Sequence, residues 1–365
     1  MLILKHEMSD ANMRLDGKRV LITGGTGSLG KVLVSRILTG EMGLPKKVIV
    51  FSRDEAKQHA MRMAYQNRQV ATDEIIYHNF DELLEFWIGD VRDFHSVASA
   101  LRNSDIVFNA AALKQVPTCE YFPYEAVRTN IEGAENIVRC IREMALPVET
   151  VVGISTDKAC KPVNVMGMSK AIQERIFISA NLTCPSTRFI CVRYGNVLAS
   201  RGSVIPLFLE QIRQGGPVTI TSPGMTRFLL SVDQAVDVIF AAVRDASDGE
   251  TYIPRVPSAR VIDIAAALMG ERPIKTKIIG VRPGEKTHEI LISEEETHRS
   301  VERNDYYVIK AILPEIAHEL PTSSALKGEY SSESDPLSVG ETKDFLKQHN
   351  LFLDGKDEET RELIR

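Results

Sequence analysis

Short apolar runs that alternate with helical patterns constrain the fold of this chain more than any other feature. Strands buried on both faces read as continuous apolar runs, and the helices between them supply parallel crossovers. The first half of the chain therefore predicts an α/β fold built on a doubly wound parallel sheet. Its expected strands are Arg19–Thr23, Lys47–Phe51, Phe86–Gly89, Ile106–Ala110, Val151–Ser155 and Phe189–Val192.

The 365 residues suit one large α/β domain with a smaller partner. We assign residues 15–195 to the sheet domain, with some later segments returning to it, and residues 196–321 mainly to a C-terminal substrate-binding domain. Residues 322–365 are polar and are expected to form a tail or an arm. Tyr65–Leu84 interrupts the alternation as an inserted loop or a short helical extension. Helical patterns in the second half cover Pro206–Gln214, Val232–Val243 and Val261–Ala267.

Composition and charge exclude several classes of protein. The net charge of −5, with both signs mixed along the chain, argues against a nucleic-acid-binding protein, which needs a basic face. No apolar stretch approaches the length of a membrane span, and the first residues lack the apolar core of a signal peptide, so we expect a cytoplasmic protein. The five scattered cysteines include no Cys-x-x-Cys pair, so neither a disulfide framework nor a metal site is expected. Cys160 is either a functional thiol or an incidental apolar residue.

A glycine-rich loop follows the first expected strand and opens a helix. It reads TGGTGSLG. One glycine of such a loop allows the tight turn, another the close approach of a pyrophosphate, and a third the packing of helix against strand. The N–H groups that begin the helix then bind phosphate, so the loop predicts a Rossmann-type dinucleotide site, the alternative being a plain glycine turn. The residues expected to line it are Thr23, Gly24, Thr26, Gly27, Ser28, Leu29 and Gly30.

The end of the second expected strand bears on which dinucleotide binds. An NAD site usually places Asp or Glu there to hold the ribose 2′-hydroxyl. Here Ser52 and Arg53 come first and Asp54 only afterwards. A hydroxyl and a guanidinium favour a 2′-phosphate, so we expect NADP, with NAD as the alternative if Asp54 takes the usual role. Further cofactor contacts are expected where the third and fourth strands end, at Asp90, Val91, Ala110, Ala111 and Ala112.

Polar side chains gather where the fifth expected strand ends. Ser155, Thr156, Asp157 and Lys158 lie there, and Lys170 follows a few residues later. The carboxyl ends of parallel strands face the crevice in which ligands bind. A hydroxyl, a carboxylate and two amines in that crevice indicate acid–base chemistry, whereas any one of them alone would be an ordinary surface group.

Further segments agree, in order along the chain, with one known family. They are FSRDE (Phe51–Glu55), GDVRD (Gly89–Asp93), AALKQVP (Ala111–Pro117), STDKACKPVNVMG (Ser155–Gly167), RYGNVLASRGSVIPLF (Arg193–Phe208), MTRF (Met225–Phe228) and RPGEK (Arg282–Lys286). With the glycine loop, they resemble the extended short-chain dehydrogenase/reductases and, within that family, the UDP-N-acetylglucosamine 4,6-dehydratases. The resemblance covers roughly residues 15–310 and is specific because separate segments agree in order.

The chain departs from the wider family at one catalytic position. That family uses a Tyr four residues before a Lys, but the Tyr position here is Met166, whose thioether has no proton to titrate. Part of the dehydratase group also has Met there, and the resemblance then assigns the acid–base chemistry to Thr156, Asp157 and Lys158. It further implies that Lys170 holds the nicotinamide ribose, with Ser155 and Lys114 as other cofactor contacts. The implied substrate contacts are Lys114, Asn196, Arg201, Ser203, Val204, Arg282 and Glu285.

The activity that the resemblance implies is 4,6-dehydration of UDP-N-acetylglucosamine with a recycled NADP, for glycan precursor synthesis, with the C5 stereochemistry left open. Asp157 would be the acid for the C6 hydroxyl and Lys158 the base for C5, which requires a shifted pKa for each, while Thr156 would bond the C4 oxygen. Two alternatives stay open: a UDP-sugar 4-epimerase on the same scaffold, and a catalytically inactive NADP-binding sensor. Family analogy also implies a homo-oligomer.

Overall fold

The computed structural model describes residues 13–71, 80–198, 203–317, 323–349 and 351–352. Within these residues, nine strands form one sheet in the order β13-β14-β9-β6-β5-β4-β1-β2-β3. The strands from β9 to β3 pair in parallel, and β14 and β13 add antiparallel pairings at one edge. The strands are β1 (Arg19–Thr23), β2 (Lys47–Ser52), β3 (Leu84–Ile88), β4 (Ile106–Asn109), β5 (Thr150–Thr156), β6 (Arg188–Tyr194), β9 (Thr251–Pro254), β13 (Ser300–Arg303) and β14 (Tyr306–Ile309).

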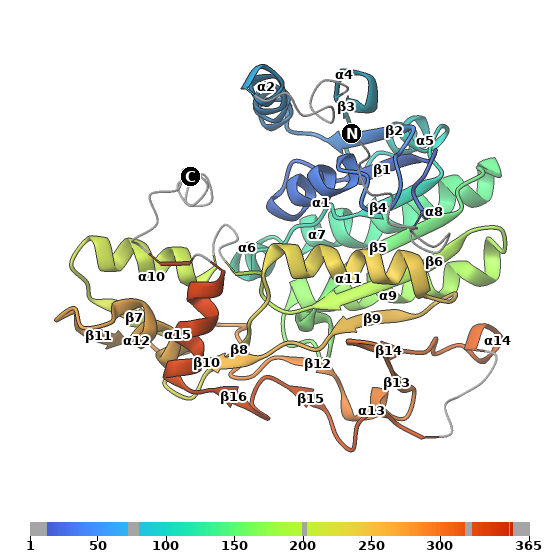
Figure 1. Ribbon diagram of the computed structural model, residues 1–365. Coiled ribbons are helices and arrows are strands. Elements are labelled where there is room, and N and C mark those ends of the chain that lie inside the picture. Colours follow the sequence, from blue (N-terminus) through green and yellow to red (C-terminus); the bar gives the residue numbers. More distant parts are fainter. Residues whose placement is uncertain (1–12, 72–79, 199–202, 318–322, 350, 353–365) are drawn as a thin grey trace, which may run out of the picture.

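Helices cover both faces of this sheet (Figure 1). On one face, α1 (Ser28–Leu38), α2 (Glu55–Ala71) and α11 (Val232–Asp245) share an apolar core with the strands. On the other face, the core is completed by α5 (Phe94–Leu101), α8 (Gly133–Met144) and α9 (Val165–Thr183). Because both faces are covered, the central strands are apolar throughout their buried length. The expected doubly wound α/β fold is confirmed, and its binding crevice lies at the carboxyl ends of the parallel strands.

A smaller unit lies beside the carboxyl ends of the strands, on the left in Figure 1. It has its own apolar core, which includes Ile205, Phe208 and Leu268. Residues 204–269 thus supply most of a second unit, while β9, β14 and β13 return to the large sheet. Its elements are α10 (Val204–Arg213), β7 (Val218–Ile220), β8 (Thr226–Phe228), β10 (Ser258–Arg260), α12 (Val261–Met269), β11 (Thr276–Ile278), β16 (Pro336–Leu337) and α15 (Val339–Gln348).

Much of the segment expected to be a polar tail is folded. β15 (Tyr330–Ser331) pairs with β12 (Ile290–Ile292), and α15 packs on α12 with Leu346 fully buried. Ser338 and Glu341 form a capping box that starts α15. The buried Leu346 and the capping box stabilise this helix although its composition is polar. Composition alone therefore predicts an arm where the structure has a packed helix. Residues 353–365 lie outside the described part of the chain.

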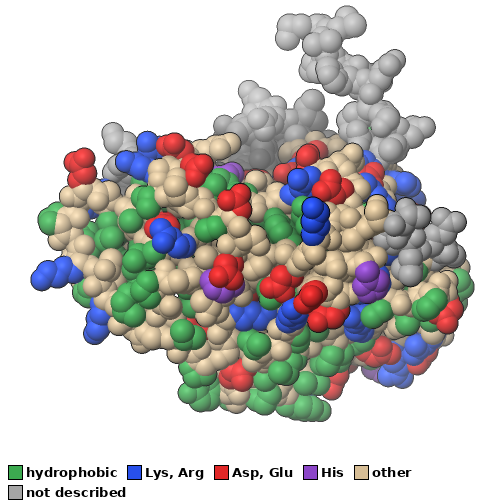
Figure 2. Space-filling view, turned by 90° about the horizontal axis from the view of Figure 1, so that it is seen from below, with side chains coloured by type: hydrophobic (Ala, Val, Ile, Leu, Met, Phe, Trp, Pro, Cys, Tyr) green, Lys and Arg blue, Asp and Glu red, His purple; other side chains and the backbone are tan. Residues whose placement is uncertain are grey.

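The Tyr65–Leu84 segment is partly helical. α2 runs through Tyr65 to Ala71, and α4 (Phe80–Leu83) leads into β3, while residues 72–79 lie outside the described part. The remaining elements are α6 (Val116–Tyr121), α7 (Pro123–Ala126), a π turn (Val127–Glu132), a 3-10 turn (Asp157–Ala159), α13 (Glu294–Thr297) and α14 (Pro314–Ala317). Among the described helices, none combines the length and apolarity needed to cross a bilayer. Figure 2 shows acidic and basic side chains interspersed over the face formed by the C-terminal segments.

Candidate active site

The glycine loop is shaped for a dinucleotide by close backbone contacts. Gly24 has a φ of +68°, and a Cβ on it would lie 2.8 Å from the Cα of Ala111, at the end of β4. A Cβ on Gly30 would lie 2.5 Å from the Cα of Gly25. These two positions therefore admit only glycine, and Gly25, which did not stand out in the sequence, proves to be the contact that requires Gly30.

The start of α1 is suited to phosphate. Its N-cap is Gly27, which has no side chain to accept the free N–H groups, and its first turn contains no acidic residue. Ser28 and Leu29 of this turn are half-buried. Free N–H groups and the positive end of the helix dipole attract a pyrophosphate, so these residues fit the phosphates of a nicotinamide dinucleotide. Thr23 points elsewhere: its buried hydroxyl donates to Asn109 Oδ1 at 2.8 Å and ties β1 to β4.

The end of β2 carries the groups that could reach the adenosine ribose. Thr26 Oγ1 lies 3.1 Å from Ser52 Oγ. The side chain of Arg53 is 60% exposed, and its nearest ion-pair partner is Asp90, with 3.9 Å between Nη1 and Oδ2. Asp54 binds Lys57 within the first turn of α2, with 2.5 Å between Oδ2 and Nζ, and this hydrogen bond lowers the pKa of Asp54. An exposed guanidinium is thus available at the strand end, while the nearby carboxylate is engaged by Lys57.

The other expected cofactor residues follow β3 and β4. Asp90 also binds Arg92, and Val91 is buried. Ala110 and Ala111 are half-buried, and Ala112 and Lys114 are exposed.

The segment expected to be catalytic forms a tight turn at the end of β5. Thr156 ends the strand, and its Oγ1 donates to Asp157 Oδ1 at 2.8 Å. Lys158 Nζ donates to the same Oδ1 at 3.0 Å and to Asn196 Oδ1 at 2.8 Å. Asp157 is fully buried, and its Oδ2 has no hydrogen-bond partner among the described residues. The structure therefore brings Thr156, Asp157, Lys158 and Asn196 together.

A third ionisable group, Glu289, completes this cluster, and the sequence does not reveal it. Its Oε1 lies 3.3 Å from Lys158 Nζ and 3.7 Å from Arg227 Nε. The side chain is 2% exposed, and Oε2 has no partner among the described residues. Glu289 belongs to a distant segment, directly before the strand β12. The signal in the sequence was a glutamate that adjoins a buried apolar run, which alone does not indicate a site.

The charges around Lys158 shift its pKa in the direction opposite to the one expected for a base. Burial alone would lower the pKa of Lys158, but the charges of Asp157 and Glu289 outweigh it and raise that pKa. Burial and the charge of Asp157 also raise the pKa of Glu289, despite the opposing charges of Lys158 and Arg227. Lys158 therefore lies between two acidic side chains whose charges favour its ammonium form.

The remaining family positions lie beside this cluster without joining it. Met166 is buried in an apolar group with Cys119 and Ala126. Lys170 Nζ donates to Ile154 O at 2.5 Å and to Gln173 Oε1 at 2.6 Å, and burial lowers its pKa to about 8. The hydroxyl of Ser155 donates to Glu174 Oε1 and does not face the crevice residues.

The expected substrate contacts divide between two segments. Ser203 is the N-cap of α10, with Oγ buried and without a partner among the described residues, and Val204 begins that helix. Arg282 and Glu285 are joined by a hydrogen bond within one turn, between Arg282 N and Glu285 Oε2. Arg201 lies outside the described residues.

The turn of Arg282 and Glu285 packs on the start of α9. Asn164, the N-cap of α9, donates from Nδ2 to Gly284 O at 2.7 Å. Lys286 Nζ donates to Cys160 O at 2.5 Å. A cavity of about 460 Å³ opens beside this turn and is lined in part by Glu285. The turn is therefore fixed directly next to the segment that carries Asp157 and Lys158.

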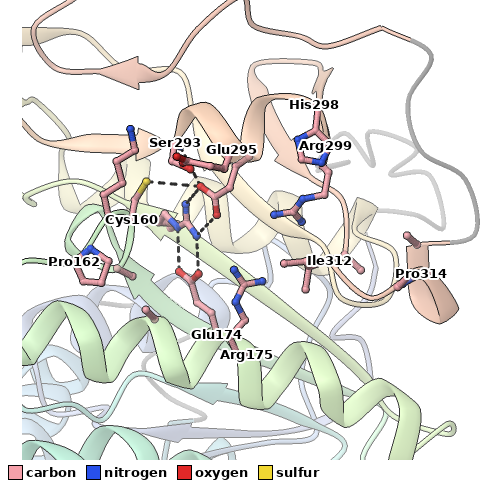
Figure 3. A pocket seen from close by; sticks show the side chains of 17 residues that line it. Cys160, Pro162, Glu174, Arg175, Ser293, Glu295, His298, Arg299, Ile312 and Pro314 are labelled. Carbon is pink, nitrogen blue, oxygen red and sulfur yellow. Dashed lines mark hydrogen bonds and ion pairs between the residues drawn. The ribbon is translucent and has the colours of Figure 1, made fainter.

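A larger cavity of about 650 Å³ lies behind the catalytic turn (Figure 3). In its wall Arg193 forms buried ion pairs with Glu174 at 2.6 Å and Glu296 at 2.8 Å. Cys160 also lines this cavity, and burial raises the pKa of its thiol to about 12. A thiol with so high a pKa is a poor nucleophile, which favours the incidental role for Cys160. The lining includes none of Thr156, Asp157 and Lys158, so this cavity is separate from the acid–base cluster.

Comparison with known proteins shows the family of this chain. Residues 20–311 match the family model described as "Polysaccharide biosynthesis protein". The chain belongs to this family. A relative named UDP-glucose 4-epimerase, from Rickettsia conorii, is 41% identical over 355 residues, which cover 94% of this chain and 98% of the relative. A protein of the same name from Rickettsia canadensis is 44% identical over 297 residues, covering 80% of this chain and 82% of the relative.

Solved structures share the short-chain dehydrogenase/reductase fold of this chain. The X-ray structure of Pen from Bacillus thuringiensis has a TM-score of 0.82 and 34% identity, and the match covers 93% of this chain and 99% of that one. A dTDP-glucose 4,6-dehydratase from Streptomyces venezuelae, with NAD bound, has a TM-score of 0.63 at 20% identity, covering 74% of this chain and 86% of that one. The chain thus combines membership of the polysaccharide biosynthesis family with this fold.

Proposed function

We propose that this enzyme removes water from UDP-N-acetylglucosamine to give a UDP-4-keto-6-deoxy-N-acetylhexosamine. The observation that supports this most is the hydrogen-bonded cluster of Thr156, the buried Asp157 and Lys158 at the end of β5, with Met166 where a Tyr would stand. Dehydration needs an acid at C6 and a base at C5 as well as a proton acceptor at C4. An epimerisation that acts only at C4 needs no acid–base pair for the neighbouring carbons.

The cofactor that we propose is NADP. Gly24, Gly27 and Gly30 would hold its pyrophosphate, and Ser52 and Arg53 would bind the 2′-phosphate, because Asp54 is engaged by Lys57. Lys170 would hold the nicotinamide ribose from its buried position on α9. Held by these residues, a nicotinamide would supply reversible hydride chemistry at C4 and C6 with no net redox change.

The residues at the end of β5 would handle the proton of the C4 hydroxyl. Thr156 bonds the C4 oxygen and relays its proton to Asp157, along the hydrogen bond between Thr156 Oγ1 and Asp157 Oδ1. Asp157 then gives this proton to the C6 hydroxyl, and the C6–O bond breaks to release water. Lys158 removes the C5 proton and later returns a proton to C5. Asp157 ends as the carboxylate that it was at the start, so the cycle closes.

The nucleotide half of the substrate would lie between the two substrate segments. Arg282 would bind the diphosphate, and Glu285 would accept hydrogen bonds from ribose hydroxyls. Ser203 and Val204 would contact the same ligand from the start of α10, together with Lys114 and Asn196. The family name and the names of the relatives at 41–44% identity support a nucleotide sugar as the ligand.

A UDP-sugar 4-epimerase is the second candidate, because those relatives carry that name. Incubation of the holoenzyme with UDP-N-acetylglucosamine in D₂O separates the two functions. Dehydration gives a product lighter by one water, with deuterium and the C5 configuration read by NMR. Epimerisation gives no loss of water and contradicts the proposal. A chain that binds NADP and turns over no UDP-sugar would be the inactive sensor.

A further inference from the structure

The Lys158 ammonium donates two side-chain hydrogen bonds and forms an ion pair with a third group. Its Nζ lies 3.0 Å from Asp157 Oδ1, 2.8 Å from Asn196 Oδ1 and 3.3 Å from Glu289 Oε1. An ammonium has no lone pair and cannot remove a proton from C5. If Lys158 is the base of the proposed dehydration, it must first transfer a proton to one of these three neighbours.

Of these three neighbours, Glu289 is the group able to hold the proton that Lys158 releases. The amide oxygen of Asn196 is not basic, and Asp157 is needed to carry the proton that goes from C4 to C6. Glu289 has a carboxylate oxygen, Oε2, that is buried and has no partner among the described residues. Protonation removes the cost of burying that charge, so a buried carboxyl accepts a proton more readily than one in water. The raised pKa of Glu289, which burial and the charge of Asp157 cause, agrees with this assignment.

We propose that Glu289 acts through Lys158 as its proton partner, an inference that rests on the proposed dehydration. An N–H bond of the Lys158 ammonium breaks and an O–H bond forms on Glu289, which leaves a neutral amine beside a neutral acid. The amine then takes the C5 proton, and the electron pair of the C–H bond moves toward the C4 ketone. After Lys158 returns a proton to C5, the pair again holds one proton in total, so no co-reactant is needed.

Three further charged groups face this pair. They are Asp157 in the turn after β5, Arg227 on β8 and Lys286 in the loop before β12. Arg227 is anchored by hydrogen bonds from its guanidinium to the carbonyls of Thr226, Thr287 and Lys286. The shared proton moves only between Lys158 and Glu289. The fraction of Lys158 that is a neutral amine therefore does not depend on solvent pH as long as the pair holds one proton.

The test is the pH dependence of dehydration in Glu289→Gln. Glutamine keeps the shape of the side chain but cannot accept the proton, so Lys158 must release it to solvent. We expect the rate of the variant to rise about tenfold per pH unit between about pH 6 and about pH 8, while the wild type stays nearly flat. Parallel rising limbs in the two proteins, or two flat profiles, would overturn the proposal. Glu289→Asp retains a carboxylate, and we expect it to be slower but flat, so a rising limb in that variant would also count against it.

A matched control is Glu250→Gln. Glu250 is likewise a buried glutamate between a lysine and an arginine, with 2.7 Å to Lys310 Nζ and 2.8 Å to Arg303 Nη1, but it lies away from the crevice. Loss of its charge should destabilise the fold and leave the pH profile of the reaction flat. A rising limb in this control would show that the limb reports damage to the fold and not the role of Glu289.

A second readout needs no turnover. Trace acetylation modifies only the neutral amine, so its rate at Lys158, followed by peptide mass spectrometry against pH, reports the protonation of that residue. In Glu289→Gln we expect half-maximal labelling at least one pH unit below that of the wild type, because one neighbouring negative charge is gone. An unchanged midpoint would overturn the pairing. A shifted midpoint in an enzyme that releases no water would refute the dehydration and leave the proton partnership intact.

Discussion

Gly167→Ala should disable the catalytic turn although it alters no functional side chain. Gly167 lies in the first turn of α9, and a Cβ there would stand 2.2 Å from the carbonyl oxygen of Lys158. Ordinary contact begins near 3.4 Å, so the turn and the helix must separate by about 1 Å. Alanine stabilises a helix by about 1 kcal/mol relative to glycine, whereas forced overpacking costs about 1–3 kcal/mol. Because the obstructing atom belongs to the backbone, we expect the clash to outweigh the gain.

The shift should affect catalysis more than stability. A displacement of about 1 Å in a catalytic group typically costs about 100-fold in rate. We therefore expect dehydration, followed by mass spectrometry, to fall about 100-fold, with a loss of about 1 kcal/mol in the free energy of unfolding. Gly224→Ala is the control, because a Cβ there meets nothing within 4 Å, and it should behave like the wild type. If Gly167→Ala were more stable than the wild type and fully active, the contact of α9 with the Lys158 carbonyl would not hold the turn.

Three further predictions concern the cofactor and the fold. Gly30→Ala, whose Cβ would lie 2.5 Å from Gly25 Cα, should abolish NADP binding measured by equilibrium dialysis, and undiminished binding would contradict the assigned loop. Arg53→Ala should lower the affinity for NADP by about 10- to 100-fold, which corresponds to one charge-assisted hydrogen bond, and leave the affinity for NAD unchanged. Equal losses of affinity for both cofactors would contradict a contact of Arg53 with the 2′-phosphate. Burial alone would raise the pKa of Glu296, but the charge of Arg193 outweighs burial and lowers this pKa to about 2. The Glu296 carboxylate therefore stabilises the fold fully above its ordinary pKa of 4.5, and this stabilisation is lost as pH falls toward 2. In Glu296→Gln the free energy of unfolding, measured with denaturant, should therefore be about 3 kcal/mol lower at neutral pH and should fall less than that of the wild type on acidification. A fall in acid equal to that of the wild type would contradict this role of Glu296.

The strands could be predicted because their signal is local. A strand in the middle of a parallel sheet is buried on both faces, so its apolar run marks it without reference to the rest of the chain. The run at Arg19–Thr23 became β1 with the same bounds, and Val151–Ser155 became β5 with one more residue at each end. The glycine loop is local in the same sense, since the turn, the cap and the helix start lie within eight residues. Asp157 and Lys158 could be found because the end of a strand is a defined place in this fold.

The rest of the site depends on contacts between distant segments. Glu289 meets Lys158 through the pairing of β12 and the packing of its loop on the turn after β5, which no local pattern encodes. The same holds for the pKa of Lys158, because burial and two carboxylates act on it in opposite directions and the sequence reveals only one of the carboxylates. The polar C-terminal segment was assigned to an arm for a related reason: the few apolar contacts that fold it, such as that of Leu346, are made with α12.

The geometry also argues that Met166 does not mark a loss of catalysis. Met166 packs against Cys119 and Ala126 in an apolar group, so its side chain has a structural place of its own. At the end of β5, a hydroxyl and a carboxylate are already joined, and they can carry the C4 proton that a phenol would otherwise take. Asp157 Oδ2 and Glu289 Oε2 are buried without partners among the described residues, and each such oxygen costs about 1–3 kcal/mol. A protein that only binds NADP gains nothing in return for that cost, whereas an enzyme that moves protons through these oxygens does.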